Sequence, residues 1–290
     1  LELLGCLSQF LVHISCPNQN NIMCGFLAIL QDAPRITLET ARAAAGRLTH
    51  RGPDGAGEWT EHHVMLFDRR LSIIDLATGQ QPMVSRDGRY VIVFNGEIYN
   101  FERIRNDLRL EGIRFRTQSD TEVLLEGFGR WGVQVVDHLH GIFAFAVWDR
   151  LTQTVFGARD RLGIKPLAWA VSRGSMVLSS TLEPFDELQD VGRVDPVAVR
   201  DLLAFDYIPS PRSILQGVQK LEPGCSFQWS PGDEAPRIER YWAPPSADLN
   251  ADAPSEKHLE ELLQQVVRRQ MISDVPVGVF LSGGIDSSLL

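Results

Sequence analysis

Short apolar segments of strand length recur from residue 24 onward, and they limit the folds that this chain can adopt. Because they are rich in β-branched and aromatic residues, they predict strands over residues 24–30, 90–94, 142–148, 155–158, 167–171 and 176–179. Apolar residues at helical spacing predict helices over 38–48 and 122–131. Asn95-Gly96 is a turn dipeptide, so we expect the strand over 90–94 to end there. This pattern predicts a mixed, strand-rich layered fold with helices packed outside.

The composition changes after Trp229. Residues 230–255 are rich in Pro, Asp and Ala and are expected to form a connector. Ser255 is a suitable N-cap for a following helix with one apolar face. Residues 275–281 are then expected to form a buried strand. A second structural unit is therefore expected to begin near residue 256.

The run Ser282-Gly283-Gly284-Ile285-Asp286-Ser287-Ser288 follows that expected strand. A strand, a Ser-Gly-Gly turn and a helix start would direct backbone N–H groups toward one point, which favours phosphate binding. A carboxylate such as Asp286 would repel phosphates unless a cation lay between them, and Mg²⁺ is the natural choice. Ser-Gly-Gly alone would more often be a structural turn, but the whole run favours the phosphate site.

Cys24 stands directly behind Met23 and becomes an N-terminal residue if the methionine is removed. A free α-amino group has a pKa of about 7.7 to 8.0, which suits it to accept a proton from a thiol. Residues 1–22 precede Met23, so either they are absent from the working protein or Cys24 is not a catalyst. An over-extended reading frame or a pro-segment explains them better than a signal peptide, since they lack a basic leader.

Composition describes an ordinary chain of one to two domains, with 290 residues and 44% hydrophobic content. The net charge of −9 argues against a general nucleic-acid or anionic-membrane binder. Four cysteines without metal-ligand spacing do not resemble a disulfide framework. A reducing cytoplasm is the simplest expectation.

Several longer motifs occur in a fixed order along the chain. They are Met23-Cys24-Gly25, His50-Arg51-Gly52-Pro53-Asp54, Arg70-Leu71-Ser72-Ile73-Ile74-Asp75, Gln81-Pro82, Phe94-Asn95-Gly96-Glu97-Ile98-Tyr99-Asn100, Ser119-Asp120-Thr121-Glu122, Gly141-Ile142-Phe143-Ala144-Phe145-Ala146, Arg159-Asp160-Arg161-Leu162-Gly163-Ile164-Lys165-Pro166-Leu167 and the closing Ser-Gly-Gly run. As a set they resemble the N-terminal half of the glutamine-hydrolysing asparagine synthetases. The matches cover nearly all of residues 23–290.

The resemblance implies a fold and a division into domains. It implies an α+β N-terminal-nucleophile domain, a class II glutamine amidotransferase with a four-layer αββα sandwich, over residues 23–230. A linker over 231–255 and the truncated start of an α/β ATP-pyrophosphatase domain over 256–290 would follow. Residues 1–22 would be a non-native extension or a pro-segment.

The resemblance also implies a reaction. The Cys24 thiol would attack the side-chain amide of glutamine, form a glutamyl thioester and release ammonia. The synthetase domain would use ATP and Mg²⁺ to activate aspartate for amidation by that ammonia, while the glutaminase domain would need no cofactor. A homodimer is compatible with this interpretation. With its synthetase domain incomplete, this chain is expected at most to hydrolyse glutamine.

Site residues follow from the same resemblance. Arg70 would grip the α-carboxylate of glutamine, Asp120 with Glu97 would take its α-ammonium, and Asn95 with Gly96 would stabilise the oxyanion. Leu71, Ser72, Ile73 and Ile74 would line the substrate mostly through their backbone. The ATP site would comprise Phe280, Leu281, Ser282, Gly283, Gly284, Asp286 and Ser287, with Asp286 on Mg²⁺. Singly, Arg70 and Asp120 would more often form a surface ion pair, and Asn95-Gly96 a hairpin turn.

Three positions depart from the usual family pattern, namely Ala168, Thr181 and Glu183. These departures leave open a related synthetase with a different acceptor. A relative of the β-lactam synthetase kind, without glutaminase activity, and a nonfunctional gene fragment are also compatible with the sequence. Retention of Cys24, Arg70, Asn95 and Asp120 favours an active glutaminase.

Overall fold

Two antiparallel sheets dominate the computed structural model, which describes residues 23–71, 75, 78–188, 192–246, 255–279 and 281–289. The first sheet runs in the order β10 (Gln219–Lys220), β8 (Ala168–Ser172), β9 (Ser175–Ser179), β1 (Gly25–Gln31), β3 (Val64–Arg70) and β2 (Gly55–Glu61). The second runs in the order β12 (Arg237–Arg240), β11 (Cys225–Trp229), β7 (Thr154–Arg159), β6 (Gly141–Asp149), β5 (Tyr90–Ile98) and β4 (Met83–Val84). The strands expected between residues 24 and 179 are therefore present.

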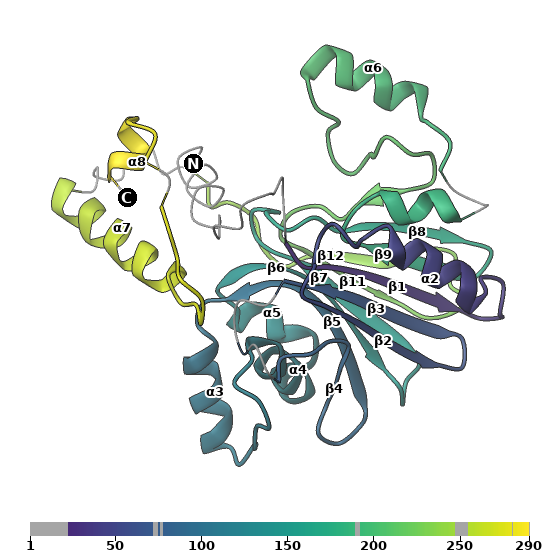
Figure 1. The fold of residues 1–290 in the computed structure, drawn as a ribbon, viewed down its shortest axis with the longest axis horizontal. Helices are drawn as coiled ribbons and strands as arrows, with labels where there is room; N and C mark the ends of the chain where they lie inside the picture. Colours follow the sequence, from purple (N-terminus) through teal and green to yellow (C-terminus); the bar gives the residue numbers. More distant parts are fainter. Residues whose placement is uncertain are drawn as a thin grey trace.

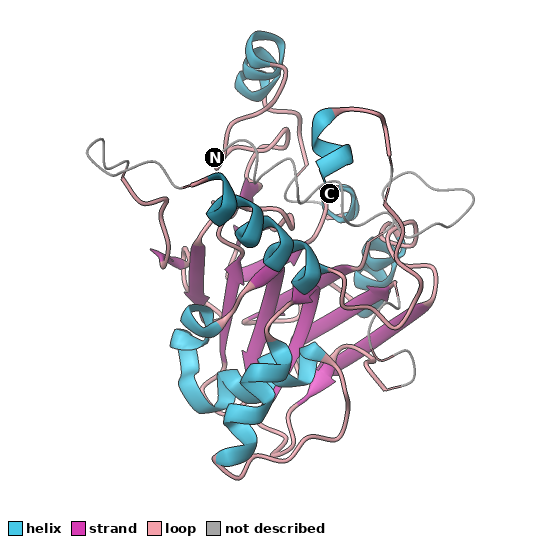
Figure 2. Cartoon of the chain, turned by 90° about the vertical axis from the view of Figure 1, so that its left-hand side faces the viewer, coloured by secondary structure: helices cyan, strands magenta, loops and turns pink. Residues whose placement is uncertain are grey.

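Helices cover the outer face of each sheet (Figure 1). On the first sheet lie α2 (Leu38–Gly46) and the 3-10 turn η2 (Glu183–Glu187). On the second lie α3 (Phe101–Leu110), α4 (Asp120–Trp131), the 3-10 turn η1 (Gly132–Gln134) and α5 (Val135–His138). Figure 2 shows the two sheets stacked between these helices. The predicted four-layer αββα sandwich is confirmed.

The space between the two sheets holds a continuous apolar core that includes Phe26, Leu66 and Val93. Successive side chains of a strand point to opposite faces, so residues at even spacing from these three share their inward direction. That rule places four polar residues at one end of the space between the sheets, and they are Cys24, Arg70, Asn95 and Glu97. The strand alternation thus gathers the predicted site residues before any loop is considered.

Strand β5 continues through Asn95 and Gly96, so the expected end of the strand at this dipeptide is wrong. The two residues pair with Ala144 and Phe143 of β6. A Cβ atom on Gly96 would lie 2.2 Å from the backbone oxygen of Ile142, closer than any real side chain approaches. The glycine is needed here for close contact between neighbouring strands rather than for a turn.

The connector expected over residues 230–255 is also wrong in part. Residues Arg237–Arg240 form β12, which pairs with β11 and extends the second sheet. Its side chains are exposed, so an apolar pattern that could have indicated a strand is missing. Helix α6 (Pro196–Phe205), which the sequence did not single out, projects away from the sandwich (Figure 1).

The segment after the connector forms only some of its expected elements. Helix α7 (Glu256–Gln270) begins as predicted, with the Ser255 hydroxyl accepting a hydrogen bond from the His258 N–H at 3.2 Å. The expected buried strand over 275–281 is wrong, since its described residues form no strand and Leu281 is 73% exposed. No described strand pairs with this segment, and an isolated strand is not stable. Helix α8 (Ile285–Leu289) follows.

The expectations for residues 1–22 lie outside the described residues. Among the helices that the structure describes, none is long and apolar enough to cross a membrane.

Candidate active site

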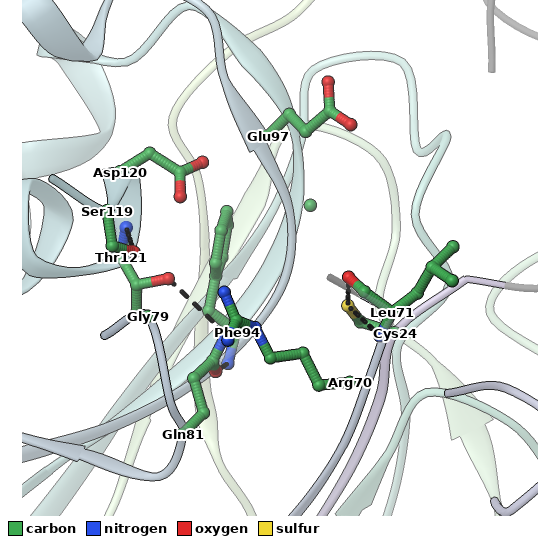
Figure 3. A pocket seen from close by; sticks show the side chains of 11 residues that line it. Cys24, Arg70, Leu71, Gly79, Gln81, Phe94, Glu97, Ser119, Asp120 and Thr121 are labelled. Carbon is green, nitrogen blue, oxygen red and sulfur yellow. Dashed lines mark hydrogen bonds between the residues drawn. The ribbon is translucent and has the colours of Figure 1, made fainter. Parts of the chain in front are cut away.

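A pocket opens at the end of the sandwich where the polar residues gather (Figure 3). It is lined by Cys24, Arg70, Leu71, Gly79, Gln81, Phe94, Gly96, Glu97, Ser119, Asp120 and Thr121. The lining includes six of the residues that the sequence assigned to glutamine hydrolysis. The structure thus brings together residues that lie far apart in the sequence.

Strand register explains how the first two of these residues meet. Strand β1 pairs with β3 so that Gly25 faces Arg69, and continuing this register by one residue sets Cys24 beside Arg70. Glu97 enters from β5 of the facing sheet, and Asp120 from the first turn of α4. Each residue is held by an element with its own packed core, which favours a fixed geometry.

The Cys24 thiol is held by the backbone of Leu71. Its Sγ accepts a hydrogen bond from the Leu71 N–H at 3.2 Å and can donate to the Leu71 carbonyl at 3.4 Å. Burial, together with the nearby Asp68 carboxylate, raises the pKa of this thiol to about 12. The thiol is therefore protonated at neutral pH and needs a base before it can act as a nucleophile.

Arg70 supplies positive charge to the pocket. Figure 3 shows its side chain reaching from beside Cys24 toward Gly79 and Gln81. Its Nη2 donates to the backbone oxygen of Asp75 at 2.6 Å. A Cβ on Gly79 would lie 2.5 Å from the same Nη2, so the glycine leaves room for the guanidinium. The planar guanidinium can bind a carboxylate through two parallel hydrogen bonds.

Two buried carboxyl groups supply the opposite charge. Asp120 lies at the start of α4, behind the N-cap Ser119, and its Oδ2 accepts from the Ile98 N–H at 3.0 Å. Burial raises the pKa of Asp120 to about 6 and that of Glu97 to about 7, although the Lys165 ammonium lowers the latter. A bound ammonium group would favour the ionised form of both carboxyls.

Strand β5 presents two donors suited to an oxyanion. Backbone N–H groups two residues apart point to the same edge of a strand. The N–H groups of Phe94 and Ile98 donate to Gln81 and Asp120 at that edge, so the Gly96 N–H between them also points toward the pocket. The predicted site residue Asn95 is 1% exposed and is not part of the pocket lining, and its Nδ2 has no partner in the described part of the chain. An unpaired buried donor is costly unless a ligand accepts from it.

Among the described residues, the remaining predicted site residues do not line this pocket. Ser72, Ile73, Ile74 and Phe280 lie outside the described residues. The predicted ATP site at Leu281–Ser287 does not contribute to the pocket lining.

Sequence reasoning also missed part of the site. Gln81 bridges two elements, accepting from the Phe94 N–H at 2.6 Å and donating to the Thr121 hydroxyl at 3.4 Å. Gln81 and Thr121 belong to motifs noted in the sequence, and that signal pointed to them without giving a role. The buried Asp68 near Cys24 belongs to none of these motifs, whereas Lys165 lies in the motif over residues 159–167, which gave it no role.

Comparison with known proteins agrees with this geometry. Residues 23–242 match the family model described as a glutamine amidotransferase domain, and residues 258–290 match one described as asparagine synthase. The chain belongs to the glutamine amidotransferase domain family. In this family member the pocket contains the cysteine at the start of the matched region.

Two curated relatives come from Bacillus subtilis (strain 168). The chain is 36% identical to asparagine synthetase [glutamine-hydrolyzing] 3 over 284 residues, covering 92% of this chain and 44% of the relative. It is 35% identical to asparagine synthetase [glutamine-hydrolyzing] 1 over 272 residues, covering 92% of this chain and 43% of the relative. The amidotransferase chain therefore spans less than half the length of these relatives.

A solved structure supports the fold alone. Glutamine phosphoribosylpyrophosphate amidotransferase from B. subtilis, complexed with ADP and GMP, superimposes with a TM-score of 0.51 at 22% identity. The match covers 76% of this amidotransferase chain and 49% of the other.

Proposed function

We propose that the chain hydrolyses glutamine to glutamate and ammonia, with Cys24 as the nucleophile. The observation that carries this proposal is the placement of the Cys24 thiol in one pocket with the Arg70 guanidinium, two carboxyls and Gly96 of β5. Glutamine carries a carboxylate, an ammonium and a neutral amide, and the pocket offers a complementary group to each. Arg70 binds the carboxylate, Asp120 and Glu97 bind the ammonium, and residues 71–74 line the substrate.

The chemistry needs one base, which accepts and returns a proton in each half of the reaction. After removal of Met23, the α-amine of Cys24 takes the thiol proton as Sγ bonds to the amide carbon. The oxyanion is stabilised by the Asn95 Nδ2 and the Gly96 N–H, and its collapse breaks the C–N bond as the proton passes to the departing ammonia. Water then attacks the thioester, which yields glutamate and restores the thiol and the amine.

We further propose that this glutaminase serves an ATP-dependent, asparagine-forming synthetase in the cytoplasm. The similarity to asparagine synthetases and the match over residues 258–290 support this proposal. ATP and aspartate would be the other substrates, Mg²⁺ the ion bound with ATP, and a homodimer a compatible assembly. The linker would lie within residues 231–255, after β12.

The described residues do not by themselves form a site for ATP and Mg²⁺. The Ser282 hydroxyl contacts that of Ser287 at 3.0 Å, and the Ser287 hydroxyl also bonds the Gly284 carbonyl. Asp286 belongs to no cluster of three metal-ligating side chains in the described part of the chain. This segment therefore takes part in no step of the proposed glutaminase reaction.

The decisive test of the glutaminase uses residues 23–290, which keep every described element. Intact mass should show that Met23 is removed, and Cys24→Ala should lower kcat for glutamine hydrolysis by at least about a thousandfold. Cys225→Ala is the matched control, because Cys225 is a buried core residue outside the pocket. Full activity of the 290-residue chain with an intact Leu1 terminus would contradict the role of the amine.

A second assay separates the glutaminase from the synthetase. Residues 24–290 supplied with ammonia, aspartate and ATP should form no asparagine. Asparagine in that assay would show that the described C-terminal segment is more complete than we propose.

A further inference from the structure

Lys165 is a buried lysine that the predicted glutaminase residues do not include. It lies in the loop between β7 and β8, and its side chain is 5% exposed. Its backbone N–H donates to the Asp160 Oδ2 at 2.9 Å, and Asp160 also accepts from the N–H groups of Phe143 and Ile164. The buried Asp160 carboxylate thus fixes the position of the loop against β6.

The Lys165 ammonium has an unusual partner. Its Nζ lies 3.1 Å from the Met23 Sδ, the only hydrogen-bond acceptor for this group among the described residues. A thioether is a weak acceptor, whereas an ammonium has three donors, so the buried charge is poorly satisfied. Met23 is also the residue whose removal would make Cys24 the first residue. Lys165 therefore contacts the residue whose removal would free the Cys24 α-amine, and its charge also acts on the Cys24 thiol.

We propose that Lys165 is a positioning residue that keeps the α-amine of Cys24 neutral and so able to accept the thiol proton. This inference rests on the proposed glutaminase function. A nearby positive charge disfavours protonation of an amine and favours ionisation of a thiol. A neutral amine and a more readily ionised thiol both make the Cys24 side chain a better nucleophile at neutral pH.

The surrounding charges agree with that role. Glu97 and Asp160 face Lys165 as negative groups, while Arg51 adds a second positive charge and its Nη2 donates to the Cys24 carbonyl at 3.3 Å. Around the Cys24 thiol, Asp68 of β3 opposes ionisation, and Lys165 and Arg70 favour it. Burial lowers the pKa of Lys165, and the nearby Glu97 acts in the opposite direction.

Lys165→Met and Lys165→Arg in residues 23–290 test this inference. The acid limb of the pH profile of kcat/KM for glutamine hydrolysis should move up by about one pH unit in Lys165→Met. Activity at pH 7 should fall by about tenfold, and Lys165→Arg should restore the position of the limb. A limb that stays in place while kcat falls would show a purely structural role and overturn the proposal.

Alkylation of Cys24 by iodoacetamide gives a readout that does not depend on turnover. Only Cys24 and Cys225 remain in residues 23–290, and Cys225 is 2% exposed. The pH at which Cys24 reacts should rise in Lys165→Met, and an unchanged profile would overturn the inference. If Lys165→Met does not fold, the same measurement on Lys165→Gln decides.

Lys220→Met is the matched control. Lys220 is a partly buried lysine whose Nζ donates to the backbone oxygen of Ile208, outside the pocket. Lys220→Met should leave the acid limb of the pH profile unchanged. An equal shift in Lys165→Met and Lys220→Met would contradict the proposal. Cys24→Ala distinguishes failure of the proposed function from failure of this inference. If Cys24→Ala retains glutaminase activity, the proposed function is wrong, regardless of the results for the Lys165 variants.

Discussion

Two regions of the described chain carry predicted sites, namely the pocket around Cys24 and the C-terminal segment, residues 255–289. They differ in how well neighbouring elements fix the side chains. At the glutamine pocket, Asn95, Asp120 and Glu97 are all less than one-tenth exposed and lie on paired strands or a packed helix. In the C-terminal segment, Leu281 is 73% and Ile285 87% exposed, and no described strand supports them. A motif becomes a site only where neighbouring elements fix its side chains and exclude water.

One hydrogen bond connects these two regions. The Asp274 carboxylate accepts from the Asp75 N–H at 2.7 Å. Asp75 has a positive φ of 51°, and its backbone oxygen accepts from Arg70. The C-terminal segment therefore contacts the backbone position that accepts a hydrogen bond from Arg70.

After Cys24→Ala, the largest effect is expected from Asn95→Ala. The Asn95 Nδ2 is buried without a partner in the described part of the chain, which fits a donor that bonds only the oxyanion. Loss of one such donor should lower kcat by about 10²- to 10³-fold with little change in KM. Steady-state glutaminase assays measure this, with the exposed Asn106→Ala of α3 as control. A change confined to KM would indicate that Asn95 binds the substrate rather than stabilising the oxyanion.

Family motifs predicted Cys24, Arg70 and Glu97, although strand β3, which carries Arg70, was not predicted; the pairing of distant strands explains why these residues meet. The apolar periods of β1, β3 and β5 define an inner face, and Cys24, Arg70 and Glu97 continue that face. The passage of β5 through Asn95-Gly96 was missed because the dipeptide has a local turn preference, which pairing with β6 overrides. Motif matching likewise could not show that residues 275–279 lack a partner strand among the described elements, because a strand depends on its neighbours.

Glu97→Gln should change stability in a pH-dependent way. Burial raises the pKa of Glu97 from 4.5 to about 7, so the unfolded state ionises first as pH rises. The folded state then loses stability between about pH 4.5 and 7, and the penalty is complete above pH 7. The variant should therefore be more stable than the parent at pH 8 by up to about 3 kcal/mol, and equally stable near pH 4.

Urea denaturation at pH 4, 6 and 8 measures this difference. Glu102→Gln on the exposed face of α3 is the control and should show no such trend. If Glu97→Gln is less stable than the parent at pH 8, then the fold favours the ionised form of Glu97, which contradicts this prediction.

Arg70→Lys should weaken glutamine binding while the fold persists. A lysine keeps the charge but loses the two parallel hydrogen bonds to a carboxylate. A charge-assisted hydrogen bond contributes about 1.5–3 kcal/mol, so KM should rise by roughly 10- to 100-fold with a smaller change in kcat. Arg69→Lys is the control, because Arg69 points to the opposite face of β3. Equal KM values for both variants would refute the role of Arg70.

The smallest effect concerns the link between the two regions. Asp274→Ala removes the acceptor for the Asp75 N–H and should loosen the backbone that holds Arg70. An exposed hydrogen bond of this kind contributes about 0.5–1.5 kcal/mol, so KM for glutamine should rise by roughly two- to tenfold. Asp286→Ala is the matched control, since it removes a carboxylate from the same segment without a described contact to the pocket. If both variants leave KM unchanged, the glutamine pocket is independent of the C-terminal segment, whereas an equal rise in both would point to the segment as a whole.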